Sequence, residues 1–395
     1  MAASMPSTID LESLGLDAGG HLLLERGLAG IQAGDRLTVH GTHPALALHL
    51  GAWCRAHGHR LDRDAAVPTV VKGTAMEARW SGAERAGAAG RVSEHADRRW
   101  GLAARGALVE AGGPPLSVEW VDRDLVWADV APQLYANATA NQWDPATAVD
   151  WGATADVPTE IEDAVVQVMT YLVENEQAAL ILPARMLSQL HPHFREVMQL
   201  LAAQVADEAR HVEIFTRRAM LHRDVLGVSG AGGRASLATL LGEQDFTLGS
   251  FLLSVLGEGT FLDLLRFLNR YAPDPVTADV TRLAGRDEAR HVAFGVAHTA
   301  HVVQTDPAFL SRLRGAVARR HAVLTDTAGL NQQVFDSLVL IAAGSWEPAA
   351  IRRGWNAVQE LQAAMGEGRR RRLAYIGFPD DEAAEISALH TRNFM

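Results

Sequence analysis

One five-residue string occurs twice in this chain, as Asp-Glu-Ala-Arg-His at residues 207–211 and again at residues 287–291. In each copy a glutamate precedes a histidine by three residues. The two pairs are Glu208 with His211 and Glu288 with His291. Side chains three residues apart lie on the same face of an α-helix. The repeat therefore predicts two helices that each present a carboxylate and an imidazole together.

Apolar stretches flank both copies, at residues 200–206 and 292–296. Burying Glu and His in such surroundings costs free energy unless the groups are paired or bind a metal. A Glu-x-x-His pair on each of two helices, joined by one Glu from each of two others, is the ligand set of dinuclear carboxylate bundles. We therefore expect a dinuclear metal site. The alternatives are a purely structural polar core and a duplicated site that has lost its metal.

The two remaining glutamates are sought on antiparallel helices that precede each repeat. Two helical arms of about 14 residues and a short turn separate such positions by about 30 residues. Counting back from Glu288 gives Glu258, at a spacing of 30 residues, and counting back from Glu208 gives Glu176, at a spacing of 32. Glu174 is a rival to Glu176. The spacing of Glu176 is closer to the spacing of 30 found in the second half, which favours Glu176, but the sequence leaves this choice open.

Charged residues inside each repeat are expected to hydrogen-bond to the ligand side chains and hold them in place. A metal-bound imidazole usually donates its second ring hydrogen to a carboxylate. Asp207 and Asp287 stand one residue before the glutamates, and each can point to the histidine of the other copy. Arg210 and Arg290 would then hold these aspartates by charge-assisted hydrogen bonds. The alternative is an ordinary surface ion pair in each copy.

With these motifs, the chain from about Trp120 to Met395 resembles the ferritin-like superfamily, specifically its O2-activating di-iron oxygenases and oxidases. The Asp-Glu-x-Arg-His form is similar to that of the hydroxylase subunits of bacterial multicomponent monooxygenases. The resemblance implies a mainly α fold, a four-helix bundle with extra C-terminal helices. It also implies two iron ions, or an Mn/Fe pair, with O2 as cosubstrate. The implied ligands, with Glu208 and Glu288 as bridging and catalytic residues, are Glu176, Glu208, His211, Glu258, Glu288 and His291.

Three positions depart from patterns within that superfamily. Phe215 stands where radical-generating ribonucleotide reductase subunits carry a tyrosine, which argues against a stored tyrosyl radical. Leu262 stands where hydrocarbon monooxygenases carry a threonine, and Ala284 where an arylamine N-oxygenase would carry an extra histidine. The substrate-binding residues are unknown. Gln204 and Thr260 are candidates for the pocket lining.

The first 65 residues show short alternating strand and helix patterns, in contrast to the long helical periodicity of the rest of the chain. We expect strands at 9–11 and 36–40 and helices at 21–31 and 44–57, which together predict a small two-layer α+β module. Roughly the first 80 residues resemble the small sulfur-carrier family called TusA, through residues 33–39 and 53–61.

The carrier motif of that family, Cys-Pro-x-Pro, is replaced here by Asp17-Ala18-Gly19-Gly20. Sulfur is carried on a thiolate, which Asp17 cannot supply. We expect Cys54 to be a packed core thiol and the module to be a docking or dimerisation unit. The predicted domains are the degenerate TusA-like module at 1–80, a linker with irregular or strand-like structure at 81–123, and the ferritin-like domain at 124–395.

Composition narrows the class of protein. The formal net charge of −11 disfavours a nucleic-acid partner. One dense basic run, at residues 369–372, is expected to be a solvated helix start or an anchor for acidic side chains; the alternative is a docking site for an acidic carrier or redox partner. The single cysteine and the absence of a signal pattern suit a cytoplasmic protein. No uninterrupted apolar run of about 18 residues occurs, so we predict no membrane span. A homodimer is compatible with such bundles.

We expect an O2-dependent di-iron or Mn/Fe oxidoreductase, specifically an oxygenase that acts on a small organic substrate. No phosphate loop or dinucleotide fingerprint is convincing, so we predict no integral flavin or nicotinamide and an external reductase or ferredoxin as electron donor. Two other functions stay open. One is a ferroxidase, and the other is a non-catalytic metal-binding assembly or carrier protein recruited through the TusA-like module.

Overall fold

A computed structural model describes residues 8–75, 79–153, 155–325 and 332–389 of the chain. Contacts divide the chain into two compact units. Unit 1 comprises residues 1–86 and 105–114, and unit 2 comprises residues 87–104 and 115–395. The segment 81–123, predicted as a connector, thus contributes to both units.

Unit 1 is built on a four-stranded sheet in the order β1-β2-β4-β3. Its strands β1 and β2 pair in parallel, and the pairs β2 with β4 and β3 with β4 are antiparallel. The elements in chain order are β1 (Thr8–Asp10), η1 (Leu16–Ala18), α1 (Gly20–Ala29), β2 (Arg36–His40), α2 (Leu46–Ala56), β3 (Arg60–Asp62) and β4 (Thr69–Val71). Two further strands, β5 (Glu84–Arg85) and β6 (Leu108–Val109), form a separate antiparallel pair.

The strand and helix order predicted for this module is confirmed. In β2, buried Leu37 and Val39 alternate with more exposed residues, so one face of the sheet meets α1 and α2 in a single core. Cys54 lies in that core, and burial raises the pKa of its thiol to about 11. A buried, protonated thiol is a poor nucleophile.

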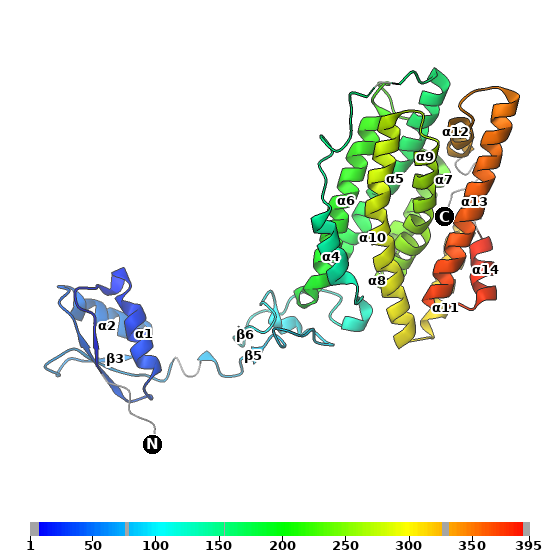
Figure 1. Cartoon of the computed structure of the whole chain (residues 1–395). Helices are drawn as coiled ribbons and strands as arrows, with labels where there is room; N and C mark the ends of the chain where they lie inside the picture. Colours follow the sequence, from blue (N-terminus) through cyan, green and yellow to red (C-terminus); the bar gives the residue numbers. More distant parts are fainter. Residues whose placement is uncertain (1–7, 76–78, 154, 326–331, 390–395) are drawn as a thin grey trace. The chain divides into compact units, whose positions relative to one another are not determined.

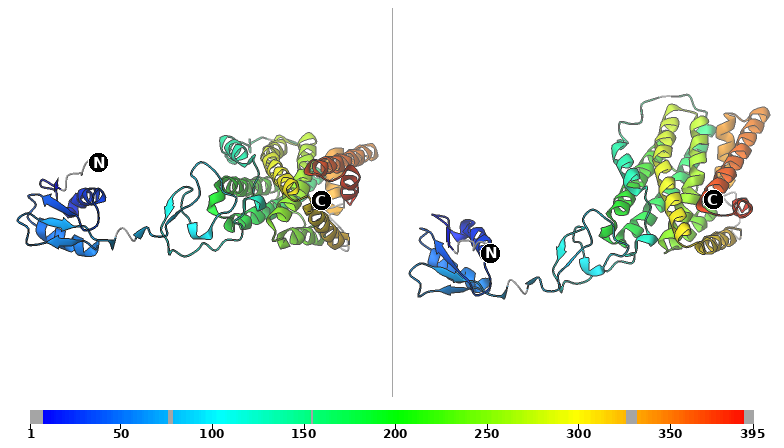
Figure 2. Two further views of the ribbon diagram at one scale, coloured as in Figure 1. Left: turned by 90° about the horizontal axis from the view of Figure 1, so that it is seen from below. Right: turned by 60° about the horizontal axis from the view of Figure 1, so that its bottom comes forward.

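Unit 2 is mainly helical (Figures 1 and 2). Its four long segments are α5 (Thr159–Ser188), α6 (Arg195–Ala219), a continuous third helix, and α10 (Pro275–Thr305). The third helix consists of α8 (Phe246–Ser250), the π-helical segment η5 (Phe251–Glu258) and α9 (Gly259–Arg270). The other helices are α4 (Ala131–Ala140), α7 (Ala231–Gly242), α11 (Phe309–Thr325), α12 (Gln332–Ala343), α13 (Pro348–Ile376) and α14 (Asp380–Ala388). Short 3₁₀ turns are η2 (Arg98–Trp100), η3 (Arg123–Leu125) and η4 (Pro192–Phe194).

Two apolar cores fill the bundle, and each of the four long segments passes through both. The third helix runs parallel to α6, because both pass from the first core to the second, whereas α5 and α10 run the opposite way. The connection from α6 to the third helix, residues 220–245, is therefore a long crossover that carries α7. One long crossover is typical of ferritin-like bundles. The predicted fold class, a ferritin-like bundle with extra C-terminal helices and a small α+β region, is confirmed.

The third helix is the most apolar segment. Among the described residues, the helix Phe246–Arg270 is the one that is long and apolar enough by itself to cross a membrane. In its apolar 18-residue stretch, 89% is buried inside the protein. A bent pair, α12 with α13, passes the same test only when taken together. The core helix of a bundle meets this criterion because it packs against neighbours on every side. Its apolarity is accounted for by packing in the bundle.

Candidate metal centre

The six predicted ligands converge between the two apolar cores. Glu176 comes from α5, Glu258 ends η5, and each repeat contributes its Glu and His from α6 or α10. Each of the six side chains belongs to a residue that is at most 5% exposed. Of the two rivals, Glu176 lies in a group of clustered carboxylate and imidazole atoms, whereas Glu174 is only half-buried and belongs to neither group.

The ligand atoms form two overlapping groups. One comprises Glu176, Glu208, His211 and Glu288, and the other comprises Glu208, Glu258, Glu288 and His291. Within each group one atom from every residue lies within 4.8 Å of the others. Glu208 and Glu288 belong to both groups. They thus occupy the position from which a carboxylate can bridge two ions.

Both imidazoles turn Nδ1 toward these carboxylates. Nδ1 of His211 lies 3.2 Å from Oε2 of Glu208 and 3.3 Å from Oε1 of Glu288. Nδ1 of His291 lies 2.9 Å from Oε1 of Glu208 and 3.4 Å from Oε2 of Glu288. Each ring thus faces both shared carboxylates with the same nitrogen.

The opposite ring nitrogens face the aspartates of the repeats in a crosswise pattern. Nε2 of His211 lies 3.4 Å from Oδ2 of Asp287, and Nε2 of His291 lies 3.2 Å from Oδ2 of Asp207. Each histidine therefore contacts the aspartate of the other repeat. In the neutral ring, this arrangement favours the tautomer with the proton on Nε2, which leaves Nδ1 free to act as a ligand.

Both arginines of the repeats hold this pair of aspartates. Arg290 donates to Asp207 at 3.0 Å and to Asp287 at 2.5 Å, and Arg210 donates to Asp207 and, at 3.4 Å, to Asp287. Although burial works against ionisation, the hydrogen bonds and positive charges of the histidines and arginines lower the pKa of both aspartates. The pairs are buried, which excludes the alternative of ordinary surface ion pairs.

Trp143 joins the same network, a contact that the sequence did not predict. Its indole Nε1 donates to Oδ2 of Asp287 at 2.8 Å, and the guanidinium of Arg210 lies 5.1 Å from its ring centroid. Trp143 is partly buried. A chain of contacts therefore leads from the indole through Asp287 to His211.

Several buried atoms of the centre have no hydrogen-bond partner in the part of the chain that the structure describes. They are Oε1 of Glu176, Oε1 of Glu208, Oε2 of Glu258, Oε2 of Glu288 and Nδ1 of His291. The contact of 2.9 Å between Nδ1 of His291 and Oε1 of Glu208 does not have the geometry of a hydrogen bond. Unsatisfied buried polar atoms are rare, and a bound ion is one explanation for them. These five are all candidate ligand atoms on residues that cluster in one place, so the donor set fits a pair of metal ions.

Protonation shows how the cluster responds to burial without metal. Burial, and then the charges of Glu288 and Glu208, raise the pKa of Glu176 well above its usual value, and burial and Glu288 do the same for Glu258. Burial alone would lower the pKa of both histidines, but their contacts with the surrounding carboxylates raise it well above the ordinary value. Protons thus offset charge that metal ions would otherwise offset.

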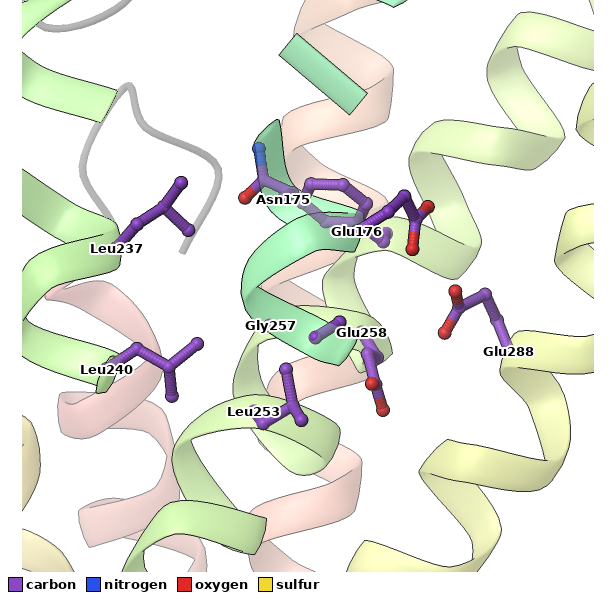
Figure 3. A pocket seen from close by; sticks show the side chains of 10 residues that line it. Asn175, Glu176, Leu237, Leu240, Leu253, Gly257, Glu258 and Glu288 are labelled. Atoms are coloured by element: carbon purple, nitrogen blue, oxygen red, sulfur yellow. The ribbon is translucent and has the colours of Figure 1, made fainter. Parts of the chain in front are cut away.

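A narrow pocket adjoins the carboxylates (Figure 3). Its volume is about 20 Å³, which is room for about one water-sized molecule. Its lining combines apolar side chains from α7, η5 and α9 with three glutamates and Asn175. The lining residues include Leu237, Leu240, Leu253, Phe261, Glu176, Glu258 and Glu288.

The two candidates for the pocket lining make other contacts. Gln204 donates from Nε2 to Oε1 of Glu258 at 3.1 Å, so it holds a predicted ligand. The hydroxyl of Thr260 donates to the carbonyl of Leu256 at 2.6 Å. Neither is among the residues that line the pocket beside the carboxylates.

No protein-family model matches the chain, and no curated protein matches it. Solved structures that it resembles include variants of an R2-like ligand-binding oxidase. One with an aerobically reconstituted Mn/Fe cofactor is 18% identical and covers 59% of this chain and 91% of its own, with a TM-score of 0.43. A second Mn/Fe form is 18% identical, and the match covers 66% of this chain and 93% of that structure's chain, with a TM-score of 0.47. An Fe/Fe form is 19% identical, and the match covers 58% of this chain and 92% of that structure's chain, with a TM-score of 0.40. At this level of similarity the assignment of the site rests on the chain's own residues.

Proposed function

We propose that the centre binds two metal ions, as an Fe/Fe or Mn/Fe pair, and that the protein is an O2-dependent oxidoreductase. The observation that carries the proposal is the convergence of four buried glutamates and two buried histidines on one space, with unsatisfied ligand atoms facing it. Oxygen-rich ligands with imidazole suit Fe(II) and Mn(II). When bound, such a pair supplies redox chemistry with O2.

Charge supports two divalent ions rather than one. Six buried carboxylates and two arginines form the centre, which leaves a formal charge of −4 when the imidazoles are neutral. Two divalent cations balance that charge. A single ion would leave a formal charge of −2, which the cluster would have to offset by keeping protons on carboxylates such as Glu176 and Glu258, whose pKa values burial raises.

The residues divide into terminal and shared roles. Glu176 and His211 serve one ion and Glu258 and His291 serve the other, whereas Glu208 and Glu288 reach both. Asp207 and Asp287 hold the protons on the distal ring nitrogens, so that each Nδ1 keeps its lone pair for the ion.

The substrate is proposed to be a small organic molecule with an apolar group, because leucines and Phe261 line the pocket beside the carboxylates. In its present state the pocket admits a guest of about the size of O2 or water. A larger substrate requires Leu237 and Leu240 on α7 to move away from Leu253 on η5. The reaction we favour is oxygenation of that substrate.

Electrons are proposed to come from an external donor, such as a reductase or ferredoxin. Trp143, Asp287 and His211 form a continuous series of contacts from a partly buried indole to the centre, at 2.8 and 3.4 Å. Such a series supports electron entry at the face of the bundle that carries Trp143.

The test is the number of Fe(II) ions bound per chain under anaerobic conditions, followed by exposure to O2 with the optical spectrum recorded. We expect about two ions per wild-type chain, loss of at least one in Glu176→Ala, and full binding in Glu174→Ala, the matched control on the same helix. Specific binding of no iron by the wild type would refute the proposal. Continued iron uptake beyond two ions per chain in air, without use of an organic substrate, would favour a ferroxidase.

A further inference from the structure

The basic run at residues 369–372 does not form one solvated face. Arg370 and Arg371 pair with Glu367 on their own helix, α13, and Arg371 is exposed. Arg369 is buried and donates to the carbonyl of Ser387 at 3.0 Å. Arg372 points into the bundle, where its Nε donates to the carbonyl of Val255 at 2.8 Å. The expected anchoring of acidic groups thus applies to only part of the run.

A glycine makes the approach of Arg372 feasible. A Cβ at Gly259 would lie 2.4 Å from Nε and 2.5 Å from Cζ of Arg372, too close for any real side chain to coexist with the guanidinium in this position. The guanidinium thus lies directly on the backbone at the junction of η5 and α9. Burial lowers the pKa of Arg372 to about 10, which still leaves it charged at neutral pH.

This junction is where a helix of π geometry returns to α geometry. The amide of Gly259 faces the carbonyls of Gly257, Leu256 and Ser254, and the last of these, five residues earlier, is the acceptor of the π pattern. At such a change of register the regular ladder of amide donors shifts, and carbonyls need other partners. The carbonyl of Val255 accepts a side-chain hydrogen bond from Arg372. The next carbonyl, that of Leu256, accepts from the hydroxyl of Thr260 as well as from the amide of Gly259.

Glu258 lies between these carbonyls and Gly259, at the last position of the π segment. One residue added to or removed from a helical turn rotates the following side chains by about 100°. The register of η5 therefore decides whether the Glu258 carboxylate faces the other ligands. Gln204 holds the carboxylate itself, whereas Arg372 contacts the backbone that carries it.

We propose that Arg372 is a positioning residue that holds η5 in its π register and thereby aims Glu258 at the second metal position. The proposal rests on the proposed function only in taking Glu258 as a ligand. Its first consequence, stabilisation of the η5 backbone, applies to the metal-free chain.

The test compares Arg372→Met with Arg371→Met in the full chain. Both substitutions remove a guanidinium from adjacent positions of α13, but only the first removes the contact with Val255. In the metal-free protein, we expect amide hydrogen exchange over residues 255–260 to be faster in Arg372→Met and unchanged in Arg371→Met. Equal exchange in both variants and the wild type would overturn the proposal, whether or not the chain binds metal.

Metal binding supplies the second readout, with Co(II) as an anaerobic spectroscopic probe. Loss of a supporting contact typically weakens metal binding by about 10-fold to 100-fold. We expect that loss at one of two Co(II) steps in Arg372→Met, with a changed absorption spectrum for that step, and wild-type behaviour in Arg371→Met. Unaltered affinities and spectra in Arg372→Met would contradict the proposed role. Failure of the wild type to bind Co(II) would instead refute the proposed function.

Gly259→Ala tests the same contact from the opposite side. Its Cβ would displace the guanidinium without removing it, so this variant should reproduce the exchange and Co(II) results of Arg372→Met. This arm decides the question if Arg372→Met fails to fold. Wild-type exchange and binding in a folded Gly259→Ala would overturn the proposal.

Discussion

Replacing Asp287 by Asn should weaken one metal position more than the other. Asp287 accepts hydrogen bonds from Trp143 at 2.8 Å and Arg290 at 2.5 Å, and its Oδ2 lies 3.4 Å from Nε2 of His211. It makes no such contact with His291, whose Nε2 faces Asp207 at 3.2 Å instead. The substitution keeps the size of the side chain but removes its charge.

The magnitude follows from the kind of contact that is lost. Removing the carboxylate that orients a metal-bound imidazole typically costs about 10-fold to 100-fold in metal affinity. That range corresponds to about 1.4 to 2.8 kcal/mol of binding free energy. We expect this loss at the ion bound by His211 and Glu176, and a change below about 3-fold at the other ion. Asp207→Asn should show the reverse selectivity.

Anaerobic calorimetric titration with Mn(II) resolves the two binding steps, and the ligand variants His211→Ala and His291→Ala identify which ion each step represents. If Asp287→Asn and His211→Ala weaken the same step, while Asp207→Asn and His291→Ala weaken the other, the crosswise assignment is correct. Equal weakening of both steps by each aspartate variant would refute the reasoning, because the contacts would then act as one undivided network. Unchanged binding in both would show that the aspartates do not support the ligands.

Three further predictions concern protons and packing. The pKa values of His211, His291, Glu176 and Glu258 are raised in the metal-free cluster, so binding of two divalent ions should release more than one proton and metal affinity should fall as the pH drops. Calorimetry in buffers of different ionisation enthalpy counts the released protons, and a count of zero would contradict this prediction. Burial lowers the pKa of His298 from 6.5 to about 4, so the unfolded chain binds more protons between these values and stability is lost as the pH falls through this window. Between pH 7 and pH 5 the loss due to His298 should be about 2 kcal/mol, and His298→Gln should reduce the measured difference in urea unfolding by that amount. Arg218 is fully buried against two carboxylates, at 2.7 Å from both Glu162 and Asp274, so Arg218→Ala should destabilise the protein by about 3 to 5 kcal/mol. Arg223 is only partly buried and pairs with the exposed Asp163, so Arg223→Ala should cost at most about 1 kcal/mol, and equal denaturation midpoints for the two variants would refute this.

The repeated string predicted much of the candidate site because the helices around it are long and regular. Counting back from Glu208 and Glu288 located Glu176 and Glu258, since each pair of helical arms is joined by a connection short enough to keep the spacing near 30 residues. The crosswise contact of each aspartate with the other repeat followed from the same regularity. The choice between Glu174 and Glu176 needed the structure, because it depends on the rotation of α5 relative to its neighbours.

The π register of η5 could not be read from the sequence. Residues 251–257 contain almost only apolar side chains, and all of them are buried, so no polar face indicates how many residues complete a turn. The same holds for Arg372, which is indistinguishable in sequence from Arg370 and Arg371, although it alone reaches the backbone of η5. Contacts that join distant segments, such as Trp143 with Asp287, carry no local signal either.

The position of the centre ties metal binding to the stability of the bundle. The polar layer interrupts the apolar packing of all four helices, and without metal its carboxylates are neutralised only in part, by protons and by the arginines. An ion that binds only the folded chain adds about 4 kcal/mol of stability when its free concentration is 1,000 times its Kd. Residues that position a ligand therefore affect both the metal affinity and the stability of the metal-bound fold. A variant that misdirects Glu258 should lose part of the stabilisation by metal even where its metal-free unfolding is unchanged, which separates a defect of the site from a defect of the fold.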